Sequence, residues 1–265
     1  MTATLLAPTD LAAALAPVER WLVVLDFDGT LSPIVDRPDA ARPADGALEA
    51  VRAVAERTRV AIVSGRPLDD LRARTGDLPV TWAGGHGAEV VTRDGQLTRM
   101  IDPAAVAATL DRAVAAVDAL VDRADGWLLE RKSTSLAVHH RHVPPSVEAT
   151  ALPQVRAALE ARCDDPPGFE VLAGKAVLEL RPAGVDKGQA LAWLAARAPD
   201  LDPLVVGDDV TDEDAFRAAV ERGGVGVLVS EVPRPTAASW RLAGADEVVA
   251  LLVALTRTDH ERTER

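Results

Sequence analysis

The chain has 265 residues, a formal net charge of -12 at pH 7, and a hydrophobic content of 48%. This length suggests one large domain or two modest ones, and the hydrophobic content is sufficient for a buried core. The acidic balance argues against nucleic acid or an anionic membrane surface as a partner. A single cysteine, Cys163, excludes an internal disulfide and fits a reducing compartment.

Residues 1–17 are rich in alanine and leucine but have no basic stretch, and Asp10 interrupts them. We therefore expect a first helix here rather than a signal peptide. No apolar run approaches the roughly 18 residues that a membrane-spanning helix needs. These features predict a cytoplasmic, monomeric protein whose partner is a small molecule and not a membrane.

Apolar runs that lead into polar or glycine-rich stretches predict parallel strands in the first part of the chain. The clearest run, at residues 21–25, leads directly into Asp26-Phe27-Asp28-Gly29-Thr30. The other elements predicted here are helices at 43–57 and 68–75, strands at 60–63 and 80–83, and a hairpin at 88–100. Asp94-Gly95 marks the turn of that hairpin.

The middle of the chain has a different pattern. Its predicted elements are helices at 103–123 and 144–162 and strands at 127–131, 135–141, 170–172 and 176–181. Pro153 is expected to interrupt the second helix. This order predicts an α+β unit with its helices on one face of an antiparallel sheet. On the last strand Lys175, Val177, Glu179 and Arg181 alternate onto the other face, where charged side chains would suit a lid.

The α/β pattern then resumes. Its predicted elements are helices at 187–197, 211–220 and 243–255 and strands at 204–206 and 225–229. Thr211 is expected to cap a helix, and the charged tail at 256–265 is expected to be disordered. The sequence thus predicts a parallel-sheet α/β core of residues 1–102 and 184–265, split by an inserted α+β domain (αββαββ) of residues 103–183.

Polar side chains follow the predicted parallel strands at their carboxyl ends, where open α/β sheets bind ligands. These side chains are Asp26, Asp28, Ser64, Asp208 and Asp209, and Lys187 stands at a nearby helix start. Clustered carboxylates favour Mg²⁺, whereas a lysine and a hydroxyl suit the oxygens of a phosphoryl group. A carboxylate aimed at phosphorus can act as a nucleophile, and a second acid can transfer the proton.

Each motif also has a simpler interpretation when it is taken alone. Residues 26–30 could form a polar turn after a strand, although a glycine in fourth place does not match a calcium-binding EF-hand loop. Residues 207–214 could be only a helix start, with Thr211 as cap and the acids favoured by the helix dipole. A phosphoacceptor regulatory module also has an acid pair and a lysine at strand ends, but it is much shorter and lacks a lid.

Taken together, these motifs resemble those of the haloacid dehalogenase-like phosphatases, which have a Rossmann-like core and an inserted cap. The matching motifs are Asp26-x-Asp28-Gly29-Thr30, Ser64, Lys187 and Gly207-Asp208-Asp209-x-x-Asp212. The resemblance implies that Asp26 is the nucleophile and Asp28 the general acid and base. It implies that Ser64 and Lys187 bind the phosphate and that Mg²⁺ is the cofactor. The implied metal ligands are Asp26, Asp28 through its backbone carbonyl, and Asp208, with Asp209 and Asp212 holding the metal's waters.

Longer stretches are similar to the trehalose-6-phosphate phosphatases of that superfamily. These stretches are residues 26–35, 85–89, 130–141, 174–182 and 207–216. The resemblance implies hydrolysis of trehalose 6-phosphate through an aspartyl-phosphate, the last step of trehalose biosynthesis. The implied sugar contacts are Glu130, Lys132, Lys175 and Glu179, with His86, Glu89 and Arg141 as further candidates. The nearest alternative substrate is another sugar phosphate, such as sucrose or mannosylglycerate phosphate.

Lysine usage supports these positions independently. Among 29 lysine and arginine residues the chain has only three lysines: Lys132, Lys175 and Lys187. Lysine is a compact point charge, whereas arginine is a broad planar fork, so the two are not equivalent at a tight site. All three lysines fall on expected site positions.

Overall fold

The computed structural model describes residues 2–35, 37–174 and 176–257, which form two compact units. Unit 1 comprises Met1–Thr98 and Asp186–Arg265, and unit 2 comprises Arg99–Val185. The expected roles of these units as catalytic core and cap stay predictions. The tail beyond residue 257, predicted to be disordered, lies outside the described residues. None of the helices in the described ranges is both long and apolar enough to cross a membrane.

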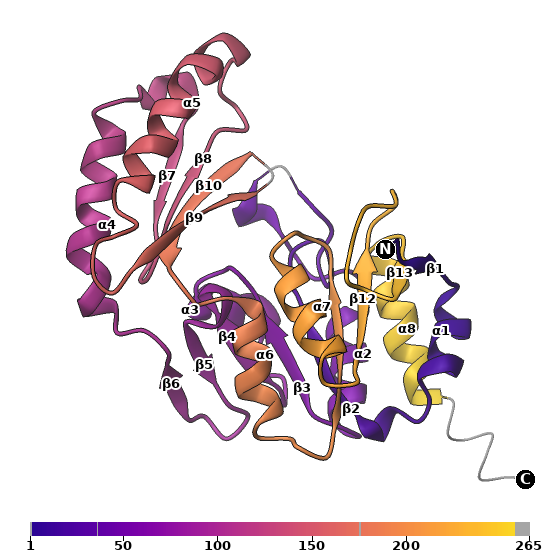
Figure 1. Ribbon diagram of the computed structural model, residues 1–265. Helices are drawn as coiled ribbons and strands as arrows, with labels where there is room; N and C mark the ends of the chain where they lie inside the picture. Colours follow the sequence, from indigo (N-terminus) through magenta and orange to yellow (C-terminus); the bar gives the residue numbers. More distant parts are fainter. Residues whose placement is uncertain (1, 36, 175, 258–265) are drawn as a thin grey trace, which may run out of the picture. The chain divides into compact units, whose positions relative to one another are not determined.

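Within the described residues, unit 1 is built on a nine-stranded sheet with the order β1-β13-β12-β11-β2-β3-β4-β5-β6 (Figure 1). The strands span Thr4–Leu5 (β1), Trp21–Leu25 (β2), Val60–Val63 (β3), Thr81–Gly84 (β4), Glu89–Val91 (β5), Leu97–Arg99 (β6), Asp202–Gly207 (β11), Val225–Val229 (β12) and Trp240–Leu242 (β13). From β1 to β4 in this order, neighbouring strands are parallel. All residues of β2 and β3 are buried, as expected for parallel strands covered on both faces.

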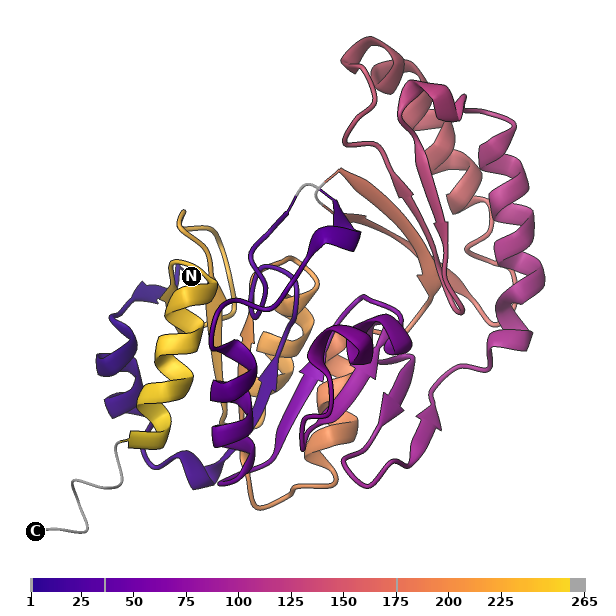
Figure 2. The ribbon, with the colours of Figure 1, turned by 180° about the vertical axis from the view of Figure 1, so that it is seen from behind.

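Helices cover both faces of this sheet (Figures 1 and 2). They span Pro8–Leu15 (α1), Ala47–Ala55 (α2), Leu68–Thr75 (α3), Lys187–Ala195 (α6), Asp212–Val220 (α7) and Ala245–Arg257 (α8). Helices α6 and α7 lie on one face, and α1, α2 and α8 lie on the other. Alternate strand residues such as Val23 and Leu25 share one buried apolar cluster with Leu11 of α1 and Leu251 of α8. The predicted parallel-sheet α/β core is therefore confirmed.

The N-terminal segment differs from the single helix predicted for residues 1–17. Strand β1 pairs in parallel with Trp240 and Arg241 of β13, and α1 begins only at Pro8. Proline suits the first helical position because it has no N–H to leave unpaired. Sequence patterns miss β1 and β13 because these strands are two and three residues long and carry no apolar run.

Within the described residues, unit 2 has a four-stranded antiparallel sheet with the order β7-β8-β10-β9. Its elements span Pro103–Asp118 (α4), Leu128–Arg131 (β7), Leu136–His139 (β8), Pro145–Glu160 (α5), Phe169–Gly174 (β9) and Val177–Pro182 (β10). Both helices lie on one face of the sheet (Figure 1). There Leu110 and Leu159 pack in one cluster with Leu136 and Leu178 of the strands. This confirms the predicted αββαββ arrangement.

Helix α5 continues through Pro153 and is not interrupted there, contrary to the prediction. Proline in a helix interior lacks the backbone N–H and crowds the carbonyl four residues earlier, here that of Ala149. Val155 and Leu159, which follow Pro153, are completely buried in the core of unit 2. Burial of these side chains offsets the local cost of the proline.

Replacing Pro153 should therefore stabilise unit 2. We expect Pro153→Ala to raise the free energy of unfolding by about 1–3 kcal/mol, because it restores a helical hydrogen bond at an exposed position. Urea-induced unfolding of the whole chain measures the change. Pro145→Ala, at the first position of the same helix, is the matched control and should give little gain. An unchanged or lower stability of Pro153→Ala would contradict this account.

Candidate active site

Two adjacent parallel strands of unit 1 end in buried carboxylates. Asp26 follows β2 and Asp208 follows β11, and their residues are 6% and 8% exposed. The backbone N–H of Asp26 donates to the carbonyl of Val206 in β11 at 2.9 Å. A Cβ at Gly29, where φ is +81°, would lie 2.3 Å from the Asp208 carboxylate. The turn after Asp26 therefore needs glycine to fold back against Asp208.

Asp212, the first residue of α7, adds a third buried carboxylate. Its Oδ2 accepts hydrogen bonds from the backbone N–H groups of Asp208 and Asp209 at 3.0 and 2.9 Å. Thr211 precedes the helix but makes no side-chain capping hydrogen bond, contrary to the prediction. Asp212 therefore holds the loop before α7 in place of Thr211.

Lys187 brings a buried positive charge to these acids. It is the first residue of α6 and is 4% exposed. Its Nζ lies 2.6 Å from Oδ1 of Asp26 and 2.7 Å from Oδ1 of Asp212. Asp26 and Lys187 are 161 residues apart in the sequence. The contact is therefore a product of the sheet topology and not of local sequence.

Burial controls the ionisation of this cluster. Removal from water raises the pKa of Asp26 well above its ordinary value, and Asp212 and Asp208 add to the increase although Lys187 opposes it. Burial alone would lower the pKa of Lys187, but the charges of Asp212 and Asp26 outweigh burial and raise it. The lysine is therefore held as a cation among acids whose negative charge it cannot fully balance.

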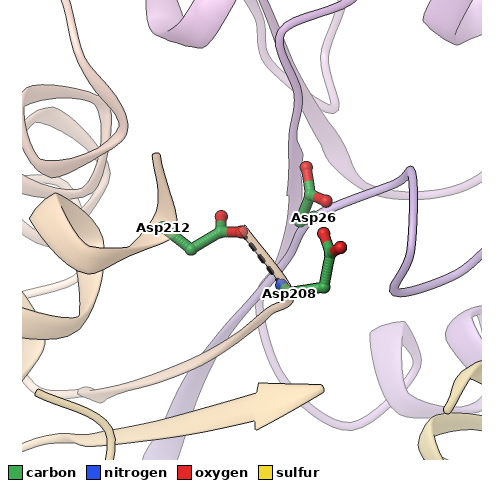
Figure 3. Close-up of side chains that lie close together, drawn as sticks. All are labelled: Asp26, Asp208 and Asp212. Atoms are coloured by element: carbon green, nitrogen blue, oxygen red, sulfur yellow. Dashed lines mark hydrogen bonds between the residues drawn. The ribbon is translucent and has the colours of Figure 1, made fainter. Parts of the chain in front are cut away.

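The three acids form a group that could hold a divalent cation (Figure 3). One ligand oxygen from each of Asp26, Asp208 and Asp212 lies within 4.8 Å of the others. Three carboxylates and one ammonium leave an excess of negative charge, and oxygen donors are those that Mg²⁺ prefers. Both oxygens of Asp212 already accept hydrogen bonds. Asp26 and Asp208 are thus better suited as direct ligands, and the residues fit the expected metal.

Ser64 lies at the same edge of the sheet, after β3, the other neighbour of β2. It is 1% exposed, and its backbone N–H donates to the carbonyl of Ala83 at 2.9 Å. Its Oγ accepts a hydrogen bond from the backbone N–H of Arg66 at 3.2 Å. Ser64, Asp26 and Asp208 therefore follow three consecutive parallel strands of the sheet.

Asp28 and Asp209, the remaining expected acids, lie outside the three-carboxylate group. Asp28 makes a two-pronged ion pair with Arg66, whose Nε and Nη2 lie 2.7 and 2.6 Å from its oxygens. Arg66 also donates to Asp70 at 2.8 Å and lies over the ring of Phe27. Sequence reasoning did not select Arg66. Arg66 could have been selected because it lies two residues after Ser64, at the end of a strand beside β2.

Unit 2 places three of the expected sugar contacts, Glu130, Lys132 and Glu179, on the sheet face opposite its helices. Lys132 Nζ lies 3.1 Å from Oε1 of Glu179, and the Ser135 hydroxyl donates to the same oxygen at 2.7 Å. Glu130 lies 3.0 Å from Nε2 of His139, and the hydrogen bond from His139 lowers the pKa of Glu130. Sequence reasoning did not assign roles to Ser135 or His139, although strand alternation places them near these acids.

The other expected contacts are dispersed. Arg141 is exposed just beyond β8 in unit 2, and Lys175 lies outside the described residues. His86 and Glu89 belong to unit 1, at the end of β4 and the start of β5. The structure therefore brings Lys132 and Glu179 into direct contact but leaves the complete sugar-binding set a prediction.

Comparisons with known proteins identify a family and several similar chains. A family model described as trehalose-phosphatase matches residues 24–246. The chain is 42% identical over 235 residues to an uncharacterized glycosyl hydrolase of Mycobacterium tuberculosis, covering 84% of this chain and 17% of that protein. It is 40% identical over 235 residues to a trehalose-phosphate phosphatase of Mycobacterium marinum, covering 85% of this chain and 58% of that protein.

Among solved structures, the chain is similar to the C-terminal domain of a trehalose-6-phosphate phosphatase of C. albicans. The TM-score is 0.82 at 25% sequence identity, and the match covers 96% of this chain and 98% of that one. By contrast, the chain spans less than two thirds of the two mycobacterial relatives that it matches.

Mg²⁺ should stabilise the folded protein by occupying the three-carboxylate group. At about 100 times its dissociation constant, the ion would add about 2.7 kcal/mol to the free energy of unfolding, which corresponds to several degrees in Tm. Calorimetry at matched ionic strength measures the shift. Asp208→Asn should remove most of it, whereas Asp118→Asn, a surface carboxylate of unit 2, should not. Equal shifts in wild type and Asp208→Asn would refute the metal assignment.

Proposed function

The chain belongs to the trehalose-phosphatase family, and on this premise we propose that it hydrolyses trehalose 6-phosphate to trehalose and phosphate. The observation that carries the proposal is the buried contact of Lys187 with Asp26 beside Asp208 at the carboxyl edge of a parallel sheet. This arrangement offers a nucleophile, a cation for the phosphoryl oxygens and a site for a divalent metal. Such a set suits phosphoryl transfer to a carboxylate.

Asp26 would act as the nucleophile. Its carboxylate attacks phosphorus, the bond from phosphorus to the sugar oxygen breaks, and an aspartyl-phosphate forms. Asp28 gives a proton to the leaving sugar oxygen and then takes one from the water that attacks the phosphorus. Phosphate leaves, and Asp26 returns as a free carboxylate. Asp28 is the more accessible of the two acids, with a side chain that is 44% exposed against 6% for Asp26. To give a proton it would first leave its ion pair with Arg66.

Ser64 and Lys187 would bind the phosphoryl group. The Lys187 ammonium is held as a cation and can donate to a phosphoryl oxygen as well as to Asp26. Ser64 is fixed after the neighbouring strand and can offer its hydroxyl proton to another oxygen. Fixed donors of this kind stabilise the charge that develops on the transferred group.

Mg²⁺ would be held by Asp26, Asp208 and the backbone carbonyl of Asp28, with Asp209 and Asp212 on its waters. When bound, the ion would neutralise phosphoryl charge and reduce the repulsion between the substrate and Asp26. Asp212 would support the site indirectly, because its carboxylate already binds Lys187 and the loop after β11.

Unit 2 would act as the cap that recognises the sugar. Trehalose offers hydroxyl groups, which carboxylates accept from and lysines donate to. Glu130, Lys132 and Glu179 are already oriented by Ser135 and His139 on one sheet face. We extend this set to Lys175, Glu89 and Arg141 on the family resemblance. Cytoplasmic location and a monomeric state stay predictions from the sequence.

A substrate panel tests the proposal. Wild type with Mg²⁺ should release phosphate from trehalose 6-phosphate far faster than from sucrose phosphate or mannosylglycerate phosphate. Asp26→Asn should lower kcat by about four orders of magnitude because the nucleophile is lost, while its circular dichroism stays unchanged. If another sugar phosphate is hydrolysed faster, that compound and not trehalose 6-phosphate is the substrate. A long-lived phosphoprotein without phosphate release would indicate a phosphoacceptor module.

Variants of the sheet face of unit 2 test its role in recognition. Lys132→Ala should lower kcat/KM for trehalose 6-phosphate by roughly 10- to 100-fold, the effect of one hydrogen bond to a charged group. Hydrolysis of phenyl phosphate, which offers no sugar hydroxyls, should change little. Arg123→Ala removes an exposed cation of the same unit and serves as the control. Equal losses on both substrates would contradict a recognition role.

A further inference from the structure

The turn Gly85-His86-Gly87 after β4 has an unusual backbone. Its three residues have successive positive φ angles of 57°, 58° and 105°. Glycine adopts such angles freely, but a residue with a side chain pays roughly 1–2 kcal/mol to do so. His86 is nevertheless the central residue, and it is 8% exposed. A strained residue of this kind persists only where its surroundings fix it, and such residues cluster at functional sites.

One side of the turn is fixed to the loop that carries Ser64. The backbone N–H of His86 donates to the Ser64 carbonyl at 2.9 Å, and that of Gly85 donates to the Arg66 carbonyl at 2.8 Å. The imidazole packs directly on Gly65, because a Cβ there would lie 2.6 Å from Cε1 of His86. The turn therefore contacts the loop at three successive residues: His86 at Ser64 and Gly65, and Gly85 at Arg66.

The other side of the turn is packed against the start of α6. A Cβ at Gly87 would lie 2.6 Å from Cβ of Ala190 and 3.6 Å from the carbonyl oxygen of Asp186. The Asp186 side chain caps α6 by accepting from the Gln189 N–H at 2.8 Å. Lys187 is the next residue after that cap. The turn thus lies between the Ser64 loop and the helix start that carries Lys187, all within unit 1.

We propose that His86 is a positioning residue that fixes Ser64 relative to Lys187 for binding of the phosphoryl group, and not a contact for the sugar. The inference rests on the proposed function, in which Ser64 and Lys187 bind phosphate together. The ring acts through Gly65, and the backbone N–H acts through the Ser64 carbonyl. His86 itself needs no contact with the substrate.

The decisive measurement compares substrates with and without a sugar. His86→Asn keeps a side chain that tolerates the left-handed backbone but loses the ring. We expect KM for trehalose 6-phosphate, KM for phenyl phosphate and Ki for inorganic phosphate to rise by the same factor, roughly tenfold or more, because misplaced groups weaken binding of every phosphate. His142→Asn, at an exposed histidine of unit 2, is the matched control and should change none of them.

A second pair of variants tests the contact itself. Gly65→Ala should raise Ki for phosphate in the wild-type background, because its Cβ would meet the His86 ring. In a His86→Gly background the ring is absent, and the same substitution should have a much smaller effect. Thermal unfolding of each variant shows whether a loss reflects misfolding. The Gly65→Ala comparison still decides the question if His86→Asn folds poorly.

The outcomes distinguish failure of the role proposed for His86 from failure of the proposed function. An increase confined to trehalose 6-phosphate, or no change at all, would overturn the role of His86 and leave the proposed function intact. Independent effects of Gly65→Ala and His86→Gly would also overturn it. If wild type hydrolyses no phosphate ester, the proposed function fails. Calorimetric titration with inorganic phosphate then still tests His86, and absence of phosphate binding by wild type would reject its role.

Discussion

The contact of the Lys187 ammonium group with Asp26 and Asp212 is the interaction on which the rest of the candidate site depends. Ions removed from water are costly unless they are paired and hydrogen-bonded. Here one cation serves two acids, and Asp208 stands beside them with a third negative charge. The cluster is therefore held together by its hydrogen bonds, but its three negative charges exceed its one positive charge. That imbalance suits the cluster to a divalent cation, which would in turn reduce the repulsion of an anionic substrate.

The sheet makes this cluster possible because β2 lies between β3 and β11. Parallel strands present their carboxyl ends at one edge, so Asp26, Ser64 and Asp208 meet there from distant parts of the chain. Unit 2 is inserted in the sequence between β6 and α6, and the chain returns to unit 1 just before Lys187. Unit 2 therefore contributes none of the side chains of this cluster. This separation fits the proposal that unit 1 transfers the phosphoryl group and unit 2 recognises the sugar.

Much of the fold could be predicted from the sequence because long apolar runs leave little choice. Residues 21–25 and 60–63 are buried throughout and can only be central strands. The secondary-structure prediction failed where tertiary packing, and not local sequence, determines whether a helix continues. Helix α5 runs through Pro153 because Val155 and Leu159 are buried beyond it.

The candidate site shows the same division. Strand ends indicated Asp26, Ser64 and Asp208, because topology alone gathers them at one edge. Thr211 looked like a cap, but a buried Asp212 holds the preceding loop instead. Arg66 could not be paired with Asp28 from sequence, since 38 residues separate them and only the adjacency of β2 and β3 brings them together.

The position of β2 between β3 and β11 also affects how the chain folds during synthesis. One neighbour, β3, emerges soon after β2 during synthesis, but the other, β11, follows only after all of unit 2. Until β11 has been synthesised, one edge of the apolar strand β2 lacks its native partner. Unpaired edges of this kind can pair with other chains. A self-contained unit 2, with its own core and mostly local strand pairing, can fold on the ribosome during this interval. The insertion that separates the two halves of the active site thereby sets the order in which the nascent chain acquires structure.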